Sequence, residues 1–309
     1  ADLVVHRLAA TAEVRTAARL LQFQISSSSY RTDLSAQANM KAITAHLATL
    51  YRLLVHPLRS RLTVLGLVFA PHSFLHGLPF AALGPAGSPL VGEFAIRQTL
   101  SGSTFAAIGR RPPREVSAPA RRPLVLGLPD ERAPFIADEA RLVARHLDAD
   151  LRLGPEATLA ALRGTGRYAS HVHIASHGLF RADSPLFSAI RLADGNLSVM
   201  DLSEVQMAAH LVTLSGCSTG SHAVLGGDEL IGLSRGFLQA GAENLLTTLW
   251  DVNDASTMRF MDLFYEQLRT GGSLSDSLRR AMLQVRQEWV HPYYWAGFAL
   301  LGGEASPRN

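Results

Sequence analysis

The spacing of apolar residues changes along the chain, and near the start it predicts helices. Residues 11–25 and 36–58 carry apolar side chains at helical intervals, and Pro57 ends the second helix because proline cannot continue one. Two short apolar runs, at 61–71 and 94–100, then predict buried strands. The first part of the chain is therefore expected to be mainly helical, with two strands at its end.

After a stretch rich in Pro, Arg and Ala at 110–121, which is the best candidate linker, short apolar runs alternate with amphipathic segments. The predicted strands are 122–129, 169–178, 209–220, 242–250 and 295–302. The predicted helices are 137–147, 157–164, 228–241, 255–269 and 273–289, with Gly241 just past the third and Ser273 starting the last. This alternation predicts an α/β fold, a mainly parallel sheet with helices on both faces. In such sheets, binding and catalytic sites form at the carboxyl ends of the strands.

Composition excludes several classes of protein. The 309 residues contain no apolar run of about 18, so no membrane span is expected, and the first residues lack the pattern of a signal peptide. A single cysteine, Cys217, cannot form an internal disulfide, so we expect a reducing, cytoplasmic location. The 29 Lys and Arg against 26 Asp and Glu are mostly scattered, which predicts a solvated surface with no direct binding of nucleic acid or membrane.

Two strand ends carry residues suited to catalysis. His177 and Gly178 follow one predicted strand, and Gly216 and Cys217 follow another. If the strands are parallel neighbours, both ends meet at one edge of the sheet, where an imidazole could turn the thiol into a thiolate. The backbone N–H beside a glycine could bind a developing oxyanion. The competing interpretations are an inert buried thiol and a histidine that bonds only to backbone.

A serine hydrolase is the rival enzyme. The letters GCSTG fit the G-x-S-x-G pattern, and Ser218, then Asp251 or Asp254, then His291 follow the chain order of α/β-hydrolases. The single glycine after His177 is a poor oxyanion segment for that fold, and the hypothesis leaves the neighbouring cysteine without a role.

Metal binding and helix capping account for other polar residues. His171 and His173 share a strand with His177, but one cysteine cannot build a structural zinc motif, so core or polar histidines are the better interpretation. No metal and no cofactor are expected. Asp228 stands just before a helix, where an N-cap is its default role, although it is also included among the expected substrate-binding residues.

Beyond these patterns, the chain resembles the CHAT domain family of caspase-like cysteine peptidases related to separase. The resemblance covers nearly the whole chain in the family's order, through segments that include VFAPHSFLHGLPFAAL, HVHIASHGLF, LVTLSGCSTG, GGDELIGLSRGFLQAGAENLLTTLWDVND and HPYYWAGFALLG. It implies a caspase-like fold, with a pseudo-protease half at 1–115 and a catalytic half at 116–309. It also implies that His177 and Cys217 form the catalytic dyad of an endopeptidase that cuts a specific protein partner, with Gly178 and Cys217 forming the oxyanion hole.

The same resemblance suggests a substrate pocket and a form of control. The first Asp of the LWDVND block, Asp251, would help bind a basic residue before the cut bond, with Trp250 beside it to exclude water. The alternative is that Asp251 caps the following helix. Residues 3–9 look like the second strand of a hairpin whose first strand is missing, so we expect an upstream sensor module or an activator protein to regulate the enzyme. A catalytically inactive scaffold or docking domain is the remaining alternative.

Overall fold

The computed structural model describes residues 3–28, 33–110, 122–131, 133–179, 184–215 and 228–303, and for 33, 34, 185 and 228–231 the backbone alone. The helices are α1 (Thr11–Ser26), α2 (Asp33–Leu54), α3 (Gly102–Gly109), α4 (Ile136–Leu147), α5 (Leu159–Gly164), α6 (Val199–Leu202), α7 (Asp228–Ala240), α8 (Asp254–Arg269), α9 (Leu274–Glu288) and α10 (Pro292–Trp295). The strands are β1 (Gly66–Phe69), β2 (Ala95–Gln98), β3 (Leu124–Gly127), β4 (Asp150–Leu153), β5 (His171–Ala175), β6 (Gly178–Leu179), β7 (Ala189–Leu192), β8 (Gly195–Ser198), β9 (Leu211–Ser215), β10 (Asn244–Thr248) and β11 (Phe298–Gly302). Short 3-10 helices occupy several connections.

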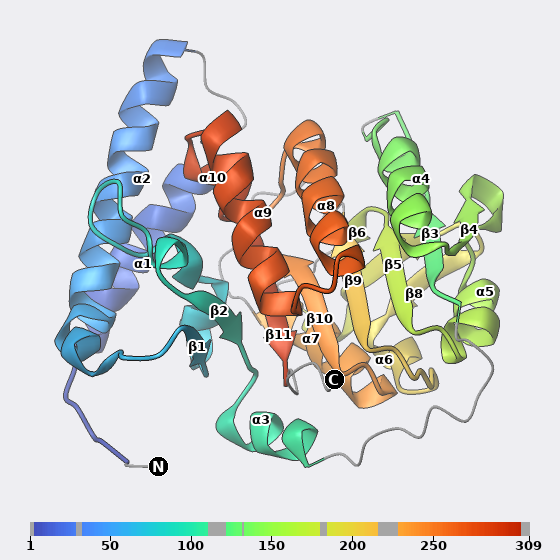
Figure 1. Cartoon of the computed structure of the whole chain (residues 1–309), viewed down its shortest axis with the longest axis horizontal. Coiled ribbons are helices and arrows are strands. Elements are labelled where there is room, and N and C mark those ends of the chain that lie inside the picture. Colours follow the sequence, from blue (N-terminus) through green and yellow to red (C-terminus); the bar gives the residue numbers. More distant parts are fainter. Residues whose placement is uncertain are drawn as a thin grey trace.

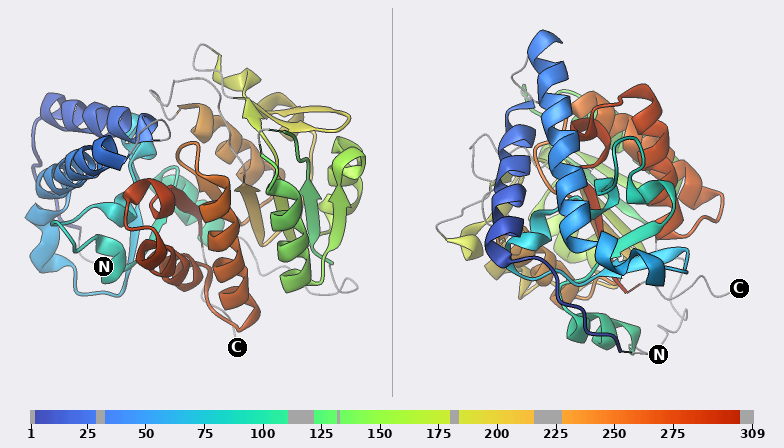
Figure 2. Two further views of the ribbon diagram at one scale, coloured as in Figure 1. Left: turned by 90° about the horizontal axis from the view of Figure 1, so that it is seen from above. Right: turned by 90° about the vertical axis from the view of Figure 1, so that its left-hand side faces the viewer.

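An eight-stranded sheet forms the centre of the molecule, in the order β1-β2-β11-β10-β9-β5-β3-β4. Its pairs are parallel except for β10 with β11, which are antiparallel. Helices α4, α8 and α9 cover the front face in Figure 1, and Figure 2 places α7 and the smaller sheet on the opposite face. The predicted mainly parallel sheet with helices on both faces is confirmed.

The strands of this sheet come from both ends of the chain. Strands β1 and β2 precede the predicted linker, of which residues 111–121 lie outside the described residues, and the C-terminal β11 joins them to β10. One apolar cluster runs from the N-terminal helices through the sheet to its last strand, for example from Leu21 through Val212 to Leu301. The division at residue 115 into a pseudo-protease half and a catalytic half stays a prediction.

Local sequence signals explain where several elements end. Gly241 has a φ of 117° directly after α7, a conformation that favours glycine. The Ser273 hydroxyl accepts the Asp276 N–H and caps α9, as expected for the residue that starts it. Residues 3–9, expected to be a hairpin strand whose partner is missing, belong to no strand in this structure, and the Leu3 and Val5 side chains are 93% and 90% exposed.

A second, antiparallel sheet of three short strands, β6-β7-β8, was not anticipated from the sequence. Its first strand, β6, has only two residues, and the third, β8, is largely exposed, so neither carries an apolar run that would reveal it. Within the parts of the chain that are described, none of the helices is long and apolar enough to cross a membrane.

Candidate active site

Four parallel strands end side by side at one edge of the main sheet. They lie in the order β10, β9, β5 and β3, and each pairs with the next; their carboxyl ends lie at the top of Figure 1. A polar residue follows each strand closely in the sequence: Asp251, Cys217, His177 and Asp130. The edge that was expected to carry chemistry is therefore where four neighbouring strands end, and three of them are followed by a described polar residue.

The register of β5 and β9 matches the two residues expected to form the dyad. Ala175 lies opposite Ser215 at the last matched pair, and the Ser176 N–H donates to the Ser215 carbonyl at 3.0 Å. His177 and Cys217 each follow that pair by two positions in the sequence. Cys217 itself, like Ser218, lies outside the described residues.

His177 bonds to a carboxylate that sequence analysis missed. Its Nε2 lies 2.9 Å from Oδ1 of Asp130, and the two side chains are only 11% and 29% exposed. Asp130 Oδ1 also accepts the Ala133 N–H at 3.2 Å, and Arg191 Nη1 lies 3.6 Å from its other oxygen. An ionised carboxylate only accepts, so the proton of the neutral imidazole belongs on Nε2, and Nδ1 keeps the lone pair of a base. Asp130 follows β3 by three positions, and the carboxyl-end rule, applied to that strand, would have found it.

Asp251 lies in an electrostatic environment shared with His177. The residue is exposed to solvent, yet protein atoms surround much of its carboxyl group, and this desolvation raises its pKa to about 6. The negative charge of Asp254 adds to the rise, and His177 opposes it. The pKa of Asp254 is also raised, first by burial and then by Glu139. A carboxyl group with a raised pKa beside an imidazole is typical of functional sites.

The helix-capping alternative for Asp251 is wrong. Asn253 caps α8, because its side chain accepts the Ser256 N–H at 3.2 Å. Trp250, the residue before Asp251, is 7% exposed, and its indole N–H donates to the Tyr293 carbonyl at 3.0 Å, so its ring is held in the core.

A buried polar network lies beneath this edge, between β5, β9 and the helices of the front face. His173 is fully buried; its Nε2 lies 3.0 Å from Glu139 of α4, and its Nδ1 lies 3.1 Å from the Tyr265 hydroxyl of α8. That hydroxyl donates to Thr213 of β9 at 2.8 Å. The interpretation of His173 as a core histidine is confirmed. Among the described residues, no three His, Cys, Asp or Glu side chains are arranged to hold a metal ion.

The other predicted residues lie apart or are only partly described. Asp228 is the first residue of α7, but its side chain is outside the described residues, so neither its capping nor its substrate-binding role is tested. Both ring nitrogens of His291 are engaged, since Nε2 lies 3.0 Å from Asn39 and Nδ1 accepts the Tyr293 N–H at 3.2 Å. That leaves no ring nitrogen of His291 for Ser218, which counts against the serine hydrolase. His171, at the opposite end of β5, is half-buried and its pKa is lowered to about 4, first by burial and then by His210.

Comparison with known proteins agrees with this geometry. The CHAT domain family model matches residues 44–303. Tetratricopeptide repeat protein 28 from Mus musculus and from Homo sapiens is 37% identical over 110 residues, which is 35% of this chain. The matched segment is 4% of the length of those proteins.

Two solved structures share the fold at low sequence identity. The Arg-specific cysteine proteinase gingipain R (RGPB) superimposes with a TM-score of 0.56 and 12% identity, over 92% of this chain and 74% of its own. The Saccharomyces cerevisiae separase–securin complex superimposes with a TM-score of 0.53 and 13% sequence identity, over 74% of this chain and 14% of the matched chain. The expected caspase-like fold is therefore confirmed.

Proposed function

The chain belongs to the CHAT domain family, and on this premise we propose that it is a cysteine endopeptidase that cuts a specific protein partner. The observation that carries the proposal is the 2.9 Å bond between Asp130 and His177, at the sheet edge where β9 also ends, two positions before Cys217 in the sequence. A strand-end imidazole oriented by a carboxylate is what a catalytic thiol requires.

In this mechanism, His177 Nδ1 takes the proton of the Cys217 thiol, and the thiolate attacks the carbonyl carbon of the substrate. Asp130 holds the imidazole in the correct tautomer and stabilises the imidazolium that forms. The protonated His177 then gives its proton to the leaving amine, and a thioester remains. Water, deprotonated by His177, hydrolyses the thioester and restores the thiol.

The backbone N–H groups of Gly178 and Cys217 are proposed to bind the oxyanion of the tetrahedral intermediate. Support comes from the small sheet. The Arg191 N–H donates to the His177 carbonyl at 2.9 Å, and Gly178 lies opposite Ile190. In an antiparallel ladder this pattern marks Gly178 as a non-hydrogen-bonded position, so its own N–H and C=O point away from β7.

A peptide electrophile that reacts with catalytic thiols tests the proposal. We expect it to modify Cys217 of the folded protein and not of the urea-unfolded protein, because only the fold brings His177 to the thiol. Asp130→Ala should slow labelling roughly tenfold to a hundredfold, since an unoriented imidazole is a poorer base. Mass spectrometry of the labelled peptide measures the rate. Equal rates for the folded and unfolded protein would contradict the enzyme and favour the inactive scaffold.

We further propose that Asp251 binds a basic residue before the cut bond. Its carboxylate follows β10 at the sheet edge that also carries His177, and surrounding protein atoms partly desolvate it. Trp250, the preceding residue, is proposed to exclude water from one side. A guanidinium would gain two charge-assisted hydrogen bonds from such a group, which favours Arg over Lys.

The raised pKa of Asp251 gives this pocket a pH dependence. Above about pH 6 the carboxyl group is ionised and binds the cation; below it the group is neutral and the attraction is lost. We expect the ratio of kcat/KM for an Arg substrate to that for a matched norleucine substrate to fall as the pH drops through 6. The ratio cancels the titration of His177, which both substrates share. In Asp251→Asn the ratio should be low and independent of pH, and an unchanged ratio in that variant would remove Asp251 from the pocket.

Regulation by an upstream module or an activator protein belongs to the same proposal. Its support is the matched segment of tetratricopeptide repeat protein 28, which is a small part of that much longer protein. The rate at which the electrophile labels Cys217 measures such control directly. Labelling of Cys217 at the same rate with and without upstream modules or candidate partners would contradict it.

A further inference from the structure

Four large apolar side chains are exposed together on the small sheet and the segments that flank it. Leu179 in β6 is 48% exposed, Leu186 and Phe187 in the 3-10 helix Pro185–Phe187 are 58% and 57% exposed, and Met200 in α6 is 58% exposed. We name these four residues the apolar rim. The segments that carry them are neighbours. Leu179 pairs with Ala189, and Ala189 is two positions after Phe187 in the sequence. The start of α6 is joined to the same segment, because the Val199 N–H donates to the Ser188 carbonyl at 3.3 Å.

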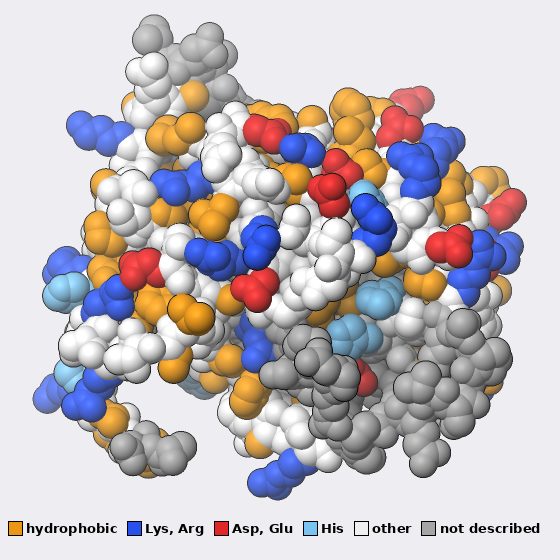
Figure 3. Space-filling model, in the orientation of Figure 1, with side chains coloured by type: hydrophobic (Ala, Val, Ile, Leu, Met, Phe, Trp, Pro, Cys, Tyr) orange, Lys and Arg blue, Asp and Glu red, His pale blue; other side chains and the backbone are white. Residues whose placement is uncertain are grey.

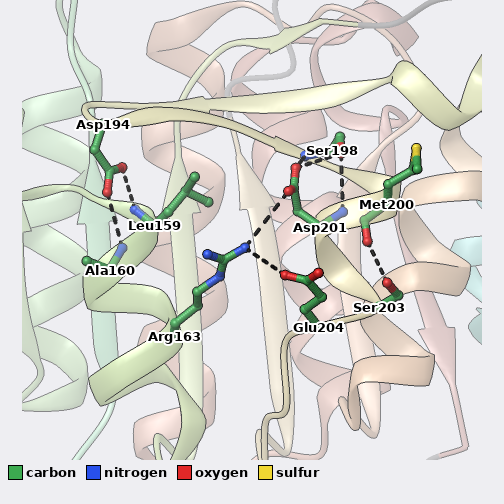
Figure 4. Close-up of polar contacts among 9 residues, drawn as sticks. All are labelled: Leu159, Ala160, Arg163, Asp194, Ser198, Met200, Asp201, Ser203 and Glu204. Carbon is green, nitrogen blue, oxygen red and sulfur yellow. Dashed lines mark hydrogen bonds and ion pairs between the residues drawn. The ribbon is translucent and has the colours of Figure 1, made fainter.

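The frame beneath Met200 is fixed by polar contacts (Figure 4). Ser198 and Asp201 form a capping box at the start of α6, and Arg163 lies 3.9 Å from Asp201 and 3.6 Å from Glu204. The Asp194 carboxylate accepts the Leu159 N–H at 2.6 Å and so ties the β7–β8 turn to α5. The Met200 side chain points away from these contacts. The rim is therefore presented on an anchored surface.

The rim also adjoins the catalytic histidine. Strand β6 begins at Gly178, directly after His177. Two hydrogen bonds join the residues before β6 to Arg191 of β7: the Arg191 N–H donates to the His177 carbonyl, and the Ser176 hydroxyl donates to the Arg191 carbonyl. Along the sheet edge the strands end in the spatial order β10, β9 and β5, and in the sequence Asp251, Cys217 and His177 follow them in turn. The rim lies on the His177 side of this row.

That order decides which part of a substrate would lie against the rim. A residue held by Asp251 belongs to the acyl part, which stays on Cys217 after the cut. The leaving amine must lie near His177, because that residue protonates it. The chain that follows the cut bond then continues on the His177 side, towards β6.

We propose that the apolar rim binds the segment of the protein substrate that follows the cut bond, as an extended chain with large apolar side chains. This inference rests on the proposed peptidase function. Two observations favour this occupant: the continuity of β6 with His177, and the Gly178 carbonyl, which the ladder register directs away from β7 and therefore leaves without a partner in that strand. Large apolar side chains exposed on neighbouring elements beside a polar site are a common mark of a docking region.

The test compares cleavage of two peptides that are identical up to the cut bond and carry either Leu-Phe or Ser-Ser after it. The wild-type enzyme should cleave the Leu-Phe peptide with a kcat/KM about tenfold higher than that for the Ser-Ser peptide. A tenfold difference is the lower end of the discrimination that one apolar group gives in a hydrophobic pocket. Phe187→Ser combined with Leu186→Ser should reduce this preference to near unity. These residues are exposed, so the variant should fold. The control is Phe105→Ser on α3, which lies at the bottom of Figure 1, away from the carboxyl ends of the strands; Phe105 is 38% exposed. It should keep the preference.

A second measurement separates this inference from the proposed function. An electrophile that ends at the residue before the cut bond should label Cys217 equally fast in wild type and in the double variant, because it does not reach the rim. Absence of labelling in both would refute the peptidase and the inference with it. Normal labelling with an unchanged leaving-side preference would refute the inference alone. A shift of the double variant from dimer to monomer by light scattering, with its preference unchanged, would instead assign the rim to a second copy of the chain.

Discussion

Replacing Cys217 with alanine is expected to abolish cleavage of a protein or peptide substrate, with a loss of kcat of roughly 10⁴- to 10⁶-fold. Removing the nucleophile of a covalent mechanism leaves only binding and oxyanion stabilisation, and losses of this size are typical of hydrolases that use a nucleophile and a base. His177→Ala should cost about as much, and the double variant little more, because the two residues act as one unit.

The matched control is Ser218→Ala at the neighbouring position, which removes the nucleophile of the rival mechanism. It should retain close to wild-type activity, measured by mass spectrometry of the cleaved fragments. Full activity in Cys217→Ala together with loss in Ser218→Ala would overturn the cysteine mechanism and restore the serine hydrolase. Loss in neither variant would show that any observed cleavage comes from a contaminant.

The largest effect on stability is expected from Glu139→Ala, at about 3 to 5 kcal/mol, the usual cost of removing one partner of a buried ion pair. Tyr265 has one hydroxyl hydrogen and donates it to Thr213, so His173 must donate its Nδ1–H to Tyr265. The other ring nitrogen of His173, Nε2, lies 3.0 Å from Glu139, and the two side chains are 0% and 5% exposed. Without Glu139, that ring nitrogen has no described partner in the core.

Urea unfolding followed by circular dichroism measures this effect, and two variants calibrate it. Asp138→Ala removes the neighbouring carboxylate of the same helix, whose pair with Arg141 is exposed, and should cost at most about 1 kcal/mol. Glu139→Gln should lose less than Glu139→Ala, since an amide can still donate to His173. A cost for Glu139→Ala as small as for Asp138→Ala would show that the buried pair contributes little.

Surface charge follows the expectation from composition. On the face in Figure 3, basic and acidic side chains are interspersed over the helices that cover the sheet, and they do not gather by sign. Exposed pairs of this kind, such as Arg259 with Glu288 at 3.0 Å, each contribute little to stability. The polar contacts expected to matter are the buried ones beneath the sheet edge.

The sequence alone determined the elements whose side chains repeat regularly. Central strands such as β3, β5, β9 and β10 are buried on both faces, so each is a short apolar run in the sequence. The amphipathic helices between them are predicted equally well, from apolar residues at helical spacing. It also located His177 and Asp251 at strand ends, because the carboxyl ends of parallel strands meet at one edge. Strands β6 and β8 of the small sheet escaped it, since a strand of two residues and a largely exposed strand show no apolar periodicity.

Only the tertiary structure decided which side chains meet. Asp130 and His177 are 47 positions apart, and nothing in their local sequence distinguishes this aspartate from one in a turn. They meet because β3 and β5 are neighbours in register, Leu126 beside Ile174. The same holds for His173, Glu139 and Tyr265, which come from a strand and two helices. Periodicity reports how a residue relates to its own element, whereas a hydrogen bond between elements depends on strand order and helix packing, which the whole core fixes together.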